Sequence, residues 1–306
     1  MLTDALGRRK KHGPAQPTEH SIKLNERDHL IFELLNRHGP LPSTYIFEMT
    51  RHIGRQRTHL IERLTHLRHG YIAPTGEHIT YLSKPAWQGT DKSRHFIYDL
   101  TDYSEAVLDD LGIRVIRRKR EHPLHRFMGA TVSASLAIYI NAHRWEFHDR
   151  NRILAHESTP EKTRDMAYPF TVNTTSGAIE PDDFFAVQEP SSTKAPNFYA
   201  VEYDRHTETM EDSKAHTSYG RKLKHYIEAL NEQAFQKHLG IPNKLKVLTI
   251  TNNERHKKNM QKYAASINAG PRFLFAHVEG FSSYGWNIPP LMLVRFEDCA
   301  GTPVEL

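Results

Sequence analysis

The sequence has a single cysteine, Cys299, in 306 residues. One thiol cannot build an intramolecular disulfide or a cysteine-based zinc site, and this scarcity is typical of proteins from a reducing compartment. We therefore expect a cytoplasmic protein. We also expect Cys299 to be chemically inert, because no activating neighbours surround it in the sequence.

Long apolar runs and the zinc motif HExxH are also absent. No segment approaches the roughly 20 apolar residues of a membrane-spanning helix. The N-terminal stretch is polar and basic, unlike a signal-peptide core. Histidines are plentiful, at 21, but the helix-spaced pairs His66/His69 and His122/His125 have no evident partner ligands. We interpret them as exposed helix positions and expect neither a membrane nor a nucleotide cofactor.

Positive charge is concentrated in two runs, Gly7–His12 and Arg114–Arg120, within a net charge of +5. Such runs suit an anionic polymer, because lysine and arginine neutralise phosphates and release counterions. The alternative is a solvated tail and a solvated linker. The pattern between the two runs favours nucleic acid.

Helical periodicity is predicted over residues 24–39, 43–50 and 55–70, followed by a hairpin over 71–82, a strand over 95–100 and a helix over 101–113. Three helices followed by a hairpin are the order of a winged helix-turn-helix, whose third helix enters the major groove. The residues expected to contact double-stranded DNA are Arg55, Gln56, Arg57, Thr58, His59 and Arg63. The alternative is a winged helix that binds protein and carries an ordinary solvated face.

The second half of the chain alternates helices and strands. Helices are predicted over residues 124–143, 212–235 and 254–269, and strands over 144–149, 179–187, 197–204, 244–252 and 272–279. Residues 155–178 are polar and punctuated by proline and glycine, which predicts a hairpin or an irregular loop. The alternation predicts an α/β domain with a mixed, partly parallel sheet covered by helices.

Acidic residues occupy the ends of two apolar strands: Asp182 on the first, and Glu202 and Asp204 on the second. A buried, unpaired carboxylate costs several kcal/mol, so such a cluster favours a cation. A hairpin would set Asp182 beside Glu202. Two carboxylates with a carbonyl, water and a phosphate oxygen form a typical Mg²⁺ environment, which would activate a water for attack on a phosphodiester.

Pro181-Asp182 followed by Glu202-Tyr203-Asp204 resembles the PD-(D/E)xK nuclease superfamily. Together with the N-terminal winged helix, the chain resembles more closely the replication-relaxation family of plasmids and integrated mobile elements, over about residues 24 to 280. The matching positions are Arg27, Asp28, Ile31, Leu34 and Leu35, then Val201, Glu202, Asp204, Arg205, Thr207 and Glu208, then Lys222 and Tyr226.

The resemblance implies that Asp182 and Glu202 bind Mg²⁺ or Mn²⁺, with Glu180 as an additional candidate ligand. The usual lysine two residues after the glutamate is Asp204 here, so Lys222 or Lys224 on the next helix would supply the cation. The predicted helix 124–143 offers no acidic residue. The catalytic set is then Asp182, Glu202, Asp204 and Lys222. The alternative is a structural ion network of Glu202 and Asp204 with Arg205, Arg221 or Lys222.

These observations predict a basic flexible tail (residues 1–20), a winged-helix DNA-binding domain (21–113), a basic linker (114–123) and a PD-(D/E)xK nuclease-like domain (124–306). The expected function is metal-dependent nicking, cleavage or processing of DNA in plasmid or mobile-element replication or mobilisation. One alternative is a non-enzymatic DNA-binding regulator with a degenerate nuclease-fold interaction or dimerisation domain, and another is a protein–protein adaptor. A homodimer is left open.

Overall fold

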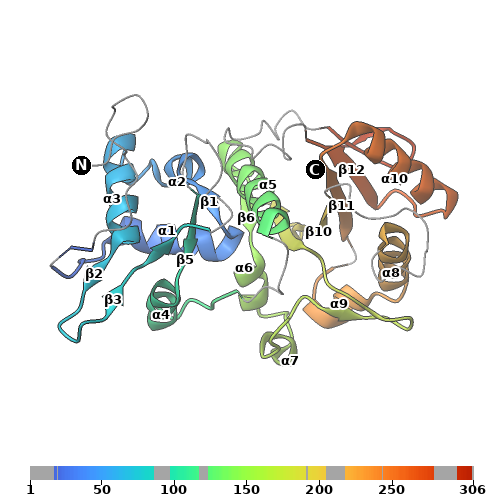
Figure 1. The fold of residues 1–306 in the computed structure, drawn as a ribbon. Coiled ribbons are helices and arrows are strands. Elements are labelled where there is room, and N and C mark those ends of the chain that lie inside the picture. The colour runs from blue at the N-terminus through green and yellow to red at the C-terminus, as the bar shows by residue number, and fades with distance from the viewer. Residues whose placement is uncertain are drawn as a thin grey trace. The chain divides into compact units, whose positions relative to one another are not determined.

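The computed structural model describes residues 17–18, 20–85, 97–116, 123–190, 192–204, 218–242, 244–278 and 295–304. The chain divides into two compact units, Met1–Val115 and Ile116–Leu306 (Figure 1). Most of the tail predicted at 1–20 and of the linker predicted at 114–123 lies outside the described residues. No helix in the described ranges has the length and apolarity needed to cross a bilayer.

The first unit contains the predicted helices, hairpin and strand in the predicted order, together with the short strand β1, which was not predicted. They are α1 (Glu26–His38), β1 (Leu41–Pro42), α2 (Ser43–Thr50), α3 (Arg57–His69), β2 (Tyr71–Ile72), β3 (His78–Ile79), β4 (Leu82–Ser83), β5 (Ile97–Leu100) and α4 (Asp102–Asp110). β2 and β3 form an antiparallel hairpin, and β5 pairs between β1 and β4. The assignment of this unit as a winged helix stays a prediction.

Two neighbouring residues of α1 tie the first three helices together. Asp28 forms a capping box with Asn25 at the start of α1, and its buried carboxylate also pairs with Arg63 of α3 at 2.5–3.2 Å. Arg27 donates two hydrogen bonds to the Thr50 hydroxyl at the end of α2. Arg27 and Asp28 therefore fix how α2 and α3 meet α1, a role that the apolar periodicity of the sequence does not reveal.

The second unit is larger. Its elements are α5 (Pro123–Ala142), β6 (Glu146–His148), α6 (Arg150–Ala155), α7 (Glu161–Arg164), β7 (Val172–Asn173), β8 (Ala178–Ile179), β9 (Asp183–Gln188), β10 (Asn197–Asp204), α8 (Tyr219–Asn231), α9 (Ala234–Leu239), β11 (Lys246–Thr251), α10 (Glu254–Ser266), β12 (Phe273–His277), β13 (Phe296–Glu297) and β14 (Pro303–Val304).

A seven-stranded mixed sheet organises this unit, in the order β14-β13-β12-β11-β10-β9-β6. β10, β11 and β12 run parallel, and β9 pairs antiparallel to β10. Alternate strand residues enter two cores: Phe184 and Ala200 pack with residues of α8 and α10, whereas Phe185 and Tyr199 pack with residues of α5. Helices therefore cover both faces (Figure 1), and the predicted α/β class with a mixed sheet is confirmed.

Departures from the predicted elements are local. Residues 155–179 hold the β7–β8 hairpin, one of the two outcomes predicted for 155–178, but the short helices α6 and α7 were not predicted. The helix predicted over 212–235 is wrong at its end, because Gln233 adopts a left-handed conformation (φ 57°) and starts α9 as a separate helix. Residues 212–217 lie outside the described part of the chain. β13 and β14 were also missed, since two residues carry no periodicity.

Candidate active site

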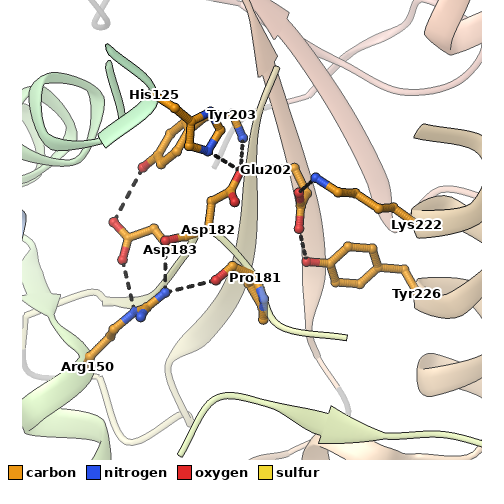
Figure 2. A network of polar contacts seen from close by, with 9 residues as sticks. All are labelled: His125, Arg150, Pro181, Asp182, Asp183, Glu202, Tyr203, Lys222 and Tyr226. Carbon is orange, nitrogen blue, oxygen red and sulfur yellow. Dashed lines mark hydrogen bonds and ion pairs between the residues drawn. The ribbon is translucent and has the colours of Figure 1, made fainter. Parts of the chain in front are cut away.

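The register of β9 and β10 brings the two predicted metal ligands to facing positions. Asp183 pairs with Val201, so Asp182 lies opposite Glu202 one step further along. The Tyr203 backbone N–H donates to Asp182 Oδ2 at 2.8 Å. Figure 2 shows the carboxyl groups of Asp182 and Glu202 next to each other at this end of the sheet. Their side chains are 16% and 5% exposed.

Glu202 is held by two residues of α8. Lys222 Nζ lies 2.9 Å from Glu202 Oε2, and the Tyr226 hydroxyl donates to Glu202 Oε1 at 2.6 Å. Lys222 and Tyr226 are four residues apart, so they share one face of the helix. The structure thus brings Lys222 to the predicted site, whereas Lys224 is exposed on α8. The Lys222 side chain is 33% exposed, so it also reaches solvent.

The two carboxyl groups have opposite pKa shifts. Burial and then the negative charge of Asp182 raise the pKa of Glu202 to about 7, against the opposing effects of Lys222 and Tyr226. Burial by itself raises the pKa of Asp182, but the contact with His125 and the charge of Lys222 outweigh it and lower that pKa. Neighbouring acids whose pKa values are pushed apart are typical of sites that handle protons or cations.

His125, near the start of α5, is a site residue that the sequence interpretation missed. Its Nε2 lies 3.2 Å from Asp182 Oδ2, and its ring meets that of Tyr203 edge-on at 6.4 Å. The expectation that His125 is an exposed helix position was wrong, since its side chain is 19% exposed. The helix without an acidic residue therefore brings an imidazole to the metal-ligand candidate instead.

Asp204 follows Glu202 on the same face of β10, two positions on. Its Oδ2 lies 2.5 Å from Nε2 of His256 in the first turn of α10, and both side chains are 4% exposed. Glu180, the additional candidate ligand, accepts a hydrogen bond from Thr171 at 2.9 Å. Asp204 and Glu180 thus have partners other than the α8 residues that contact Glu202.

The sequence profile of the replication-relaxation family matches residues 32–245. This chain belongs to the replication-relaxation family. The matched range contains Asp182, Glu202, Asp204 and Lys222, whereas Arg27 and Asp28 precede it. No curated protein and no solved structure matched the chain. Membership suggests a role in the replication or mobilisation of plasmids or other mobile elements. The motif positions Arg205, Thr207 and Glu208 lie outside the described residues.

The donor set of this replication-relaxation protein fits a hard divalent cation in one specific way. Within the described ranges, no three His, Cys, Asp or Glu side chains are arranged as a metal-binding group. Mg²⁺, however, commonly takes only one or two carboxylates and completes its shell with water and phosphate. Asp182 and Glu202 supply two. The raised pKa of Glu202 reflects burial first and then the negative charge of Asp182, and a bound cation would offset both.

In the first unit, the predicted DNA-contacting residues separate into two groups. Arg55, Gln56, Arg57, Thr58 and His59 are all exposed at the start of α3. The helix begins at Arg57, two residues later than predicted, and Gln56 is its N-cap. Arg63 instead pairs with the buried carboxylate of Asp28 and donates to the Lys23 carbonyl at 2.7 Å. Arg63 therefore has a structural use, and we leave it out of the DNA surface proposed below.

Proposed function

We propose that this replication-relaxation protein binds duplex DNA through the start of α3 and cuts a phosphodiester bond with Asp182, Glu202 and a divalent metal ion. The setting is replication or mobilisation of a plasmid or mobile element. The observation that supports the cleavage most directly is the meeting of Asp182, Glu202 and Lys222 at one end of β10. Two acids and a lysine at one position are a suitable set for phosphoryl transfer.

In this proposal Asp182 and Glu202 hold Mg²⁺ or Mn²⁺, which when bound supplies Lewis acidity and lowers the pKa of water. Tyr226 orients Glu202 by donating to Oε1. The Tyr203 N–H and His125 engage Oδ2 of Asp182. The partly exposed ammonium of Lys222 can leave Glu202 for a phosphate oxygen, where it offsets negative charge that develops during cleavage.

The DNA-binding part of the proposal rests on the exposed residues at the start of α3. Arg55 and Arg57 lie on either side of the N-cap Gln56, so two guanidinium groups extend from one turn of chain. Arginine pairs with guanine edges or phosphates, and glutamine with adenine. The N-terminal end of a helix is also the part that reaches base edges when a recognition helix enters the major groove.

A supercoiled-plasmid assay tests the cleavage. The full chain should convert supercoiled DNA to nicked or linear product with Mg²⁺ or Mn²⁺ and not with EDTA. Asp182→Ala and Glu202→Ala should each abolish the product, whereas Glu157→Ala, which removes an exposed carboxylate of the same unit, should leave it unchanged. Cleavage that survives both site substitutions would refute the assignment.

Salt dependence tests the DNA surface. Each lost phosphate contact lowers the slope of log K against log salt by about 0.9, so a combined Arg55→Ala and Arg57→Ala variant should lose about 2 if both contact phosphate. The charge-matched control combines Lys162→Ala and Lys237→Ala, two exposed lysines of the second unit. The same affinity and slope as wild type in the arginine variant would remove α3 from the interface.

One observation favours a second candidate, a non-enzymatic DNA-binding protein with a degenerate nuclease fold. Both oxygens of Glu202 already have partners in Lys222 and Tyr226, so a lysine ammonium stands where a metal ion would neutralise the acid. That candidate predicts salt-dependent DNA binding together with no Mn²⁺ binding and no cleavage under any metal. The plasmid assay and a Mn²⁺ titration therefore separate the two.

A further inference from the structure

Arg150, the first residue of α6, is a buried arginine beside the candidate site. It follows the N-cap Asp149, whose side chain accepts from the Arg152 N–H at 2.8 Å. Arg150 is only 6% exposed. A guanidinium withdrawn from water is tolerated where its charge and donors are matched, so its partners indicate what the fold uses it for.

Arg150 contacts three consecutive residues, the two that precede β9 and the first residue of that strand. Its Nη2 donates to the carbonyls of Pro181 at 3.0 Å and Asp182 at 2.9 Å. Its Nε lies 3.3 Å from Oδ1 of Asp183. Its guanidinium carbon also lies 5.0 Å from the centre of the Phe170 ring. Figure 2 shows the arginine reaching this stretch of chain from the side opposite Glu202.

The contacts from Arg150 matter for the backbone of Asp182 because Asp182 lies just outside the β9–β10 ladder. The last pair of that ladder is Asp183 with Val201. Beyond that pair, the Tyr203 N–H donates to the carboxylate of Asp182. The Asp182 carbonyl accepts instead from Arg150. Arginine therefore fixes the main chain while the Tyr203 N–H fixes the carboxylate.

We propose that Arg150 is a positioning residue that sets the distance between the Asp182 and Glu202 carboxyl groups, and so the affinity of the site for a divalent cation. The proposal rests on the function proposed above. Arg150 acts through the Pro181 and Asp182 carbonyls. Sites of this kind require supporting residues that hold ligands within about 0.5 Å of their working positions.

Arginine is suited to this role for a geometric reason. Its planar guanidinium presents several N–H donors in a fixed fork, so one side chain serves two carbonyls and a carboxylate together. Asp183, which is 4% exposed, balances the charge and lies within 3.4 Å of the Tyr203 hydroxyl. Lysine carries the same charge without the fork, so Arg150→Lys keeps the charge pairing with Asp183 and loses the shared geometry.

A Mn²⁺ titration of the full chain, with free Mn²⁺ followed by electron paramagnetic resonance, tests the proposal without relying on cleavage. Arg150→Met and Arg150→Lys should each weaken Mn²⁺ binding by about 10- to 100-fold, the range expected when a partner of a metal ligand is lost. Arg152→Met is the matched control, because Arg152 lies on the same helix, is 53% exposed and pairs with Glu146. It should bind Mn²⁺ as wild type does.

A second control separates positioning from stability. Leu274→Ala removes a fully buried side chain of β12 and should lower the melting temperature without changing Mn²⁺ affinity. If Arg150→Met does not fold, Arg150→Lys carries the test. If Asp182→Ala abolishes Mn²⁺ binding but every folded Arg150 variant binds Mn²⁺ with wild-type affinity, the positioning role of Arg150 is overturned and the proposed metal site stands. A wild-type chain that binds no Mn²⁺ overturns the proposed metal-dependent function and this role together.

Discussion

The raised pKa of Glu202 predicts an unusual dependence of stability on pH. Its pKa rises from 4.5 to about 7 in the folded protein, chiefly through burial and secondly through the charge of Asp182. The folded state then holds a proton that the unfolded chain has released. Glu202 therefore costs folding free energy increasingly as pH rises from about 4.5 to about 7, and the cost stays constant above that.

The size of the effect follows from the shift. Each pKa unit corresponds to about 1.4 kcal/mol, so the ionised Glu202 reduces the free energy of unfolding by about 3 kcal/mol above pH 7. Glu202→Gln removes this titration and still offers an amide oxygen to Tyr226. Relative to wild type, the variant should gain about 3 kcal/mol on going from pH 4.5 to pH 8. The Lys222 pair does not change that gain, because its lowering effect is already part of the pKa of about 7.

Urea unfolding at pH 4.5 and pH 8, followed by far-UV circular dichroism, measures this difference. The other titrating groups are common to both proteins and largely cancel in the comparison. Glu157→Gln, which neutralises an exposed acid, should show no such pH dependence. Mg²⁺ at pH 8 should stabilise wild type more than Glu202→Gln, because the variant keeps only the Asp182 carboxylate. A stability difference that is the same at both pH values would refute the raised pKa of Glu202.

Two further substitutions test how the fold supports the proposed sites. Asp28→Asn leaves Arg63 without its buried, charged partner. It should lower the free energy of unfolding of the first unit by about 3 kcal/mol, measured by urea unfolding. A loss below about 1 kcal/mol would contradict the role of the Asp28–Arg63 pair in joining α1 to α3. Gly129→Ala places a methyl group 2.8 Å from the Tyr203 ring. It should cost about 1–3 kcal/mol in urea unfolding and weaken Mn²⁺ binding, because Tyr203 holds Asp182; wild-type behaviour in both measurements would contradict that packing.

Local sequence signals were sufficient to predict helices α1 and α2 and the two strands that bring Asp182 and Glu202 together. Asn25 as a cap and the apolar spacing after it predicted α1, and residues 43–50 form α2 as expected. The two acid-bearing strands predicted the facing of Asp182 and Glu202, because both runs are apolar and long enough to pair. These inferences succeed since capping and strand alternation are properties of neighbouring residues.

The residues that support the site were not predictable in the same way. Arg150 meets Asp182 across 32 positions of sequence, and His125 meets it from a helix whose small residues gave no sign of the contact. Arg63 was expected to contact DNA, yet it is paired with Asp28, 35 residues away. Such pairings depend on tertiary packing, and a charged residue has the same appearance in a sequence whether it is paired or solvated.

The chain has Asp204 where the PD-(D/E)xK pattern has a lysine, and the position of Lys222 shows how this difference should be interpreted. A lysine in place of Asp204 would share the face of β10 that carries Glu202, and it would meet His256 where Asp204 now forms a buried pair. α8 supplies the cation instead, and it reaches the same acid through Lys222. Electrostatic stabilisation depends on where a charge lies in space, and the strand or helix that carries it is immaterial. The missing motif lysine therefore does not by itself argue for an inactive site, because the positive charge stands beside Glu202 all the same.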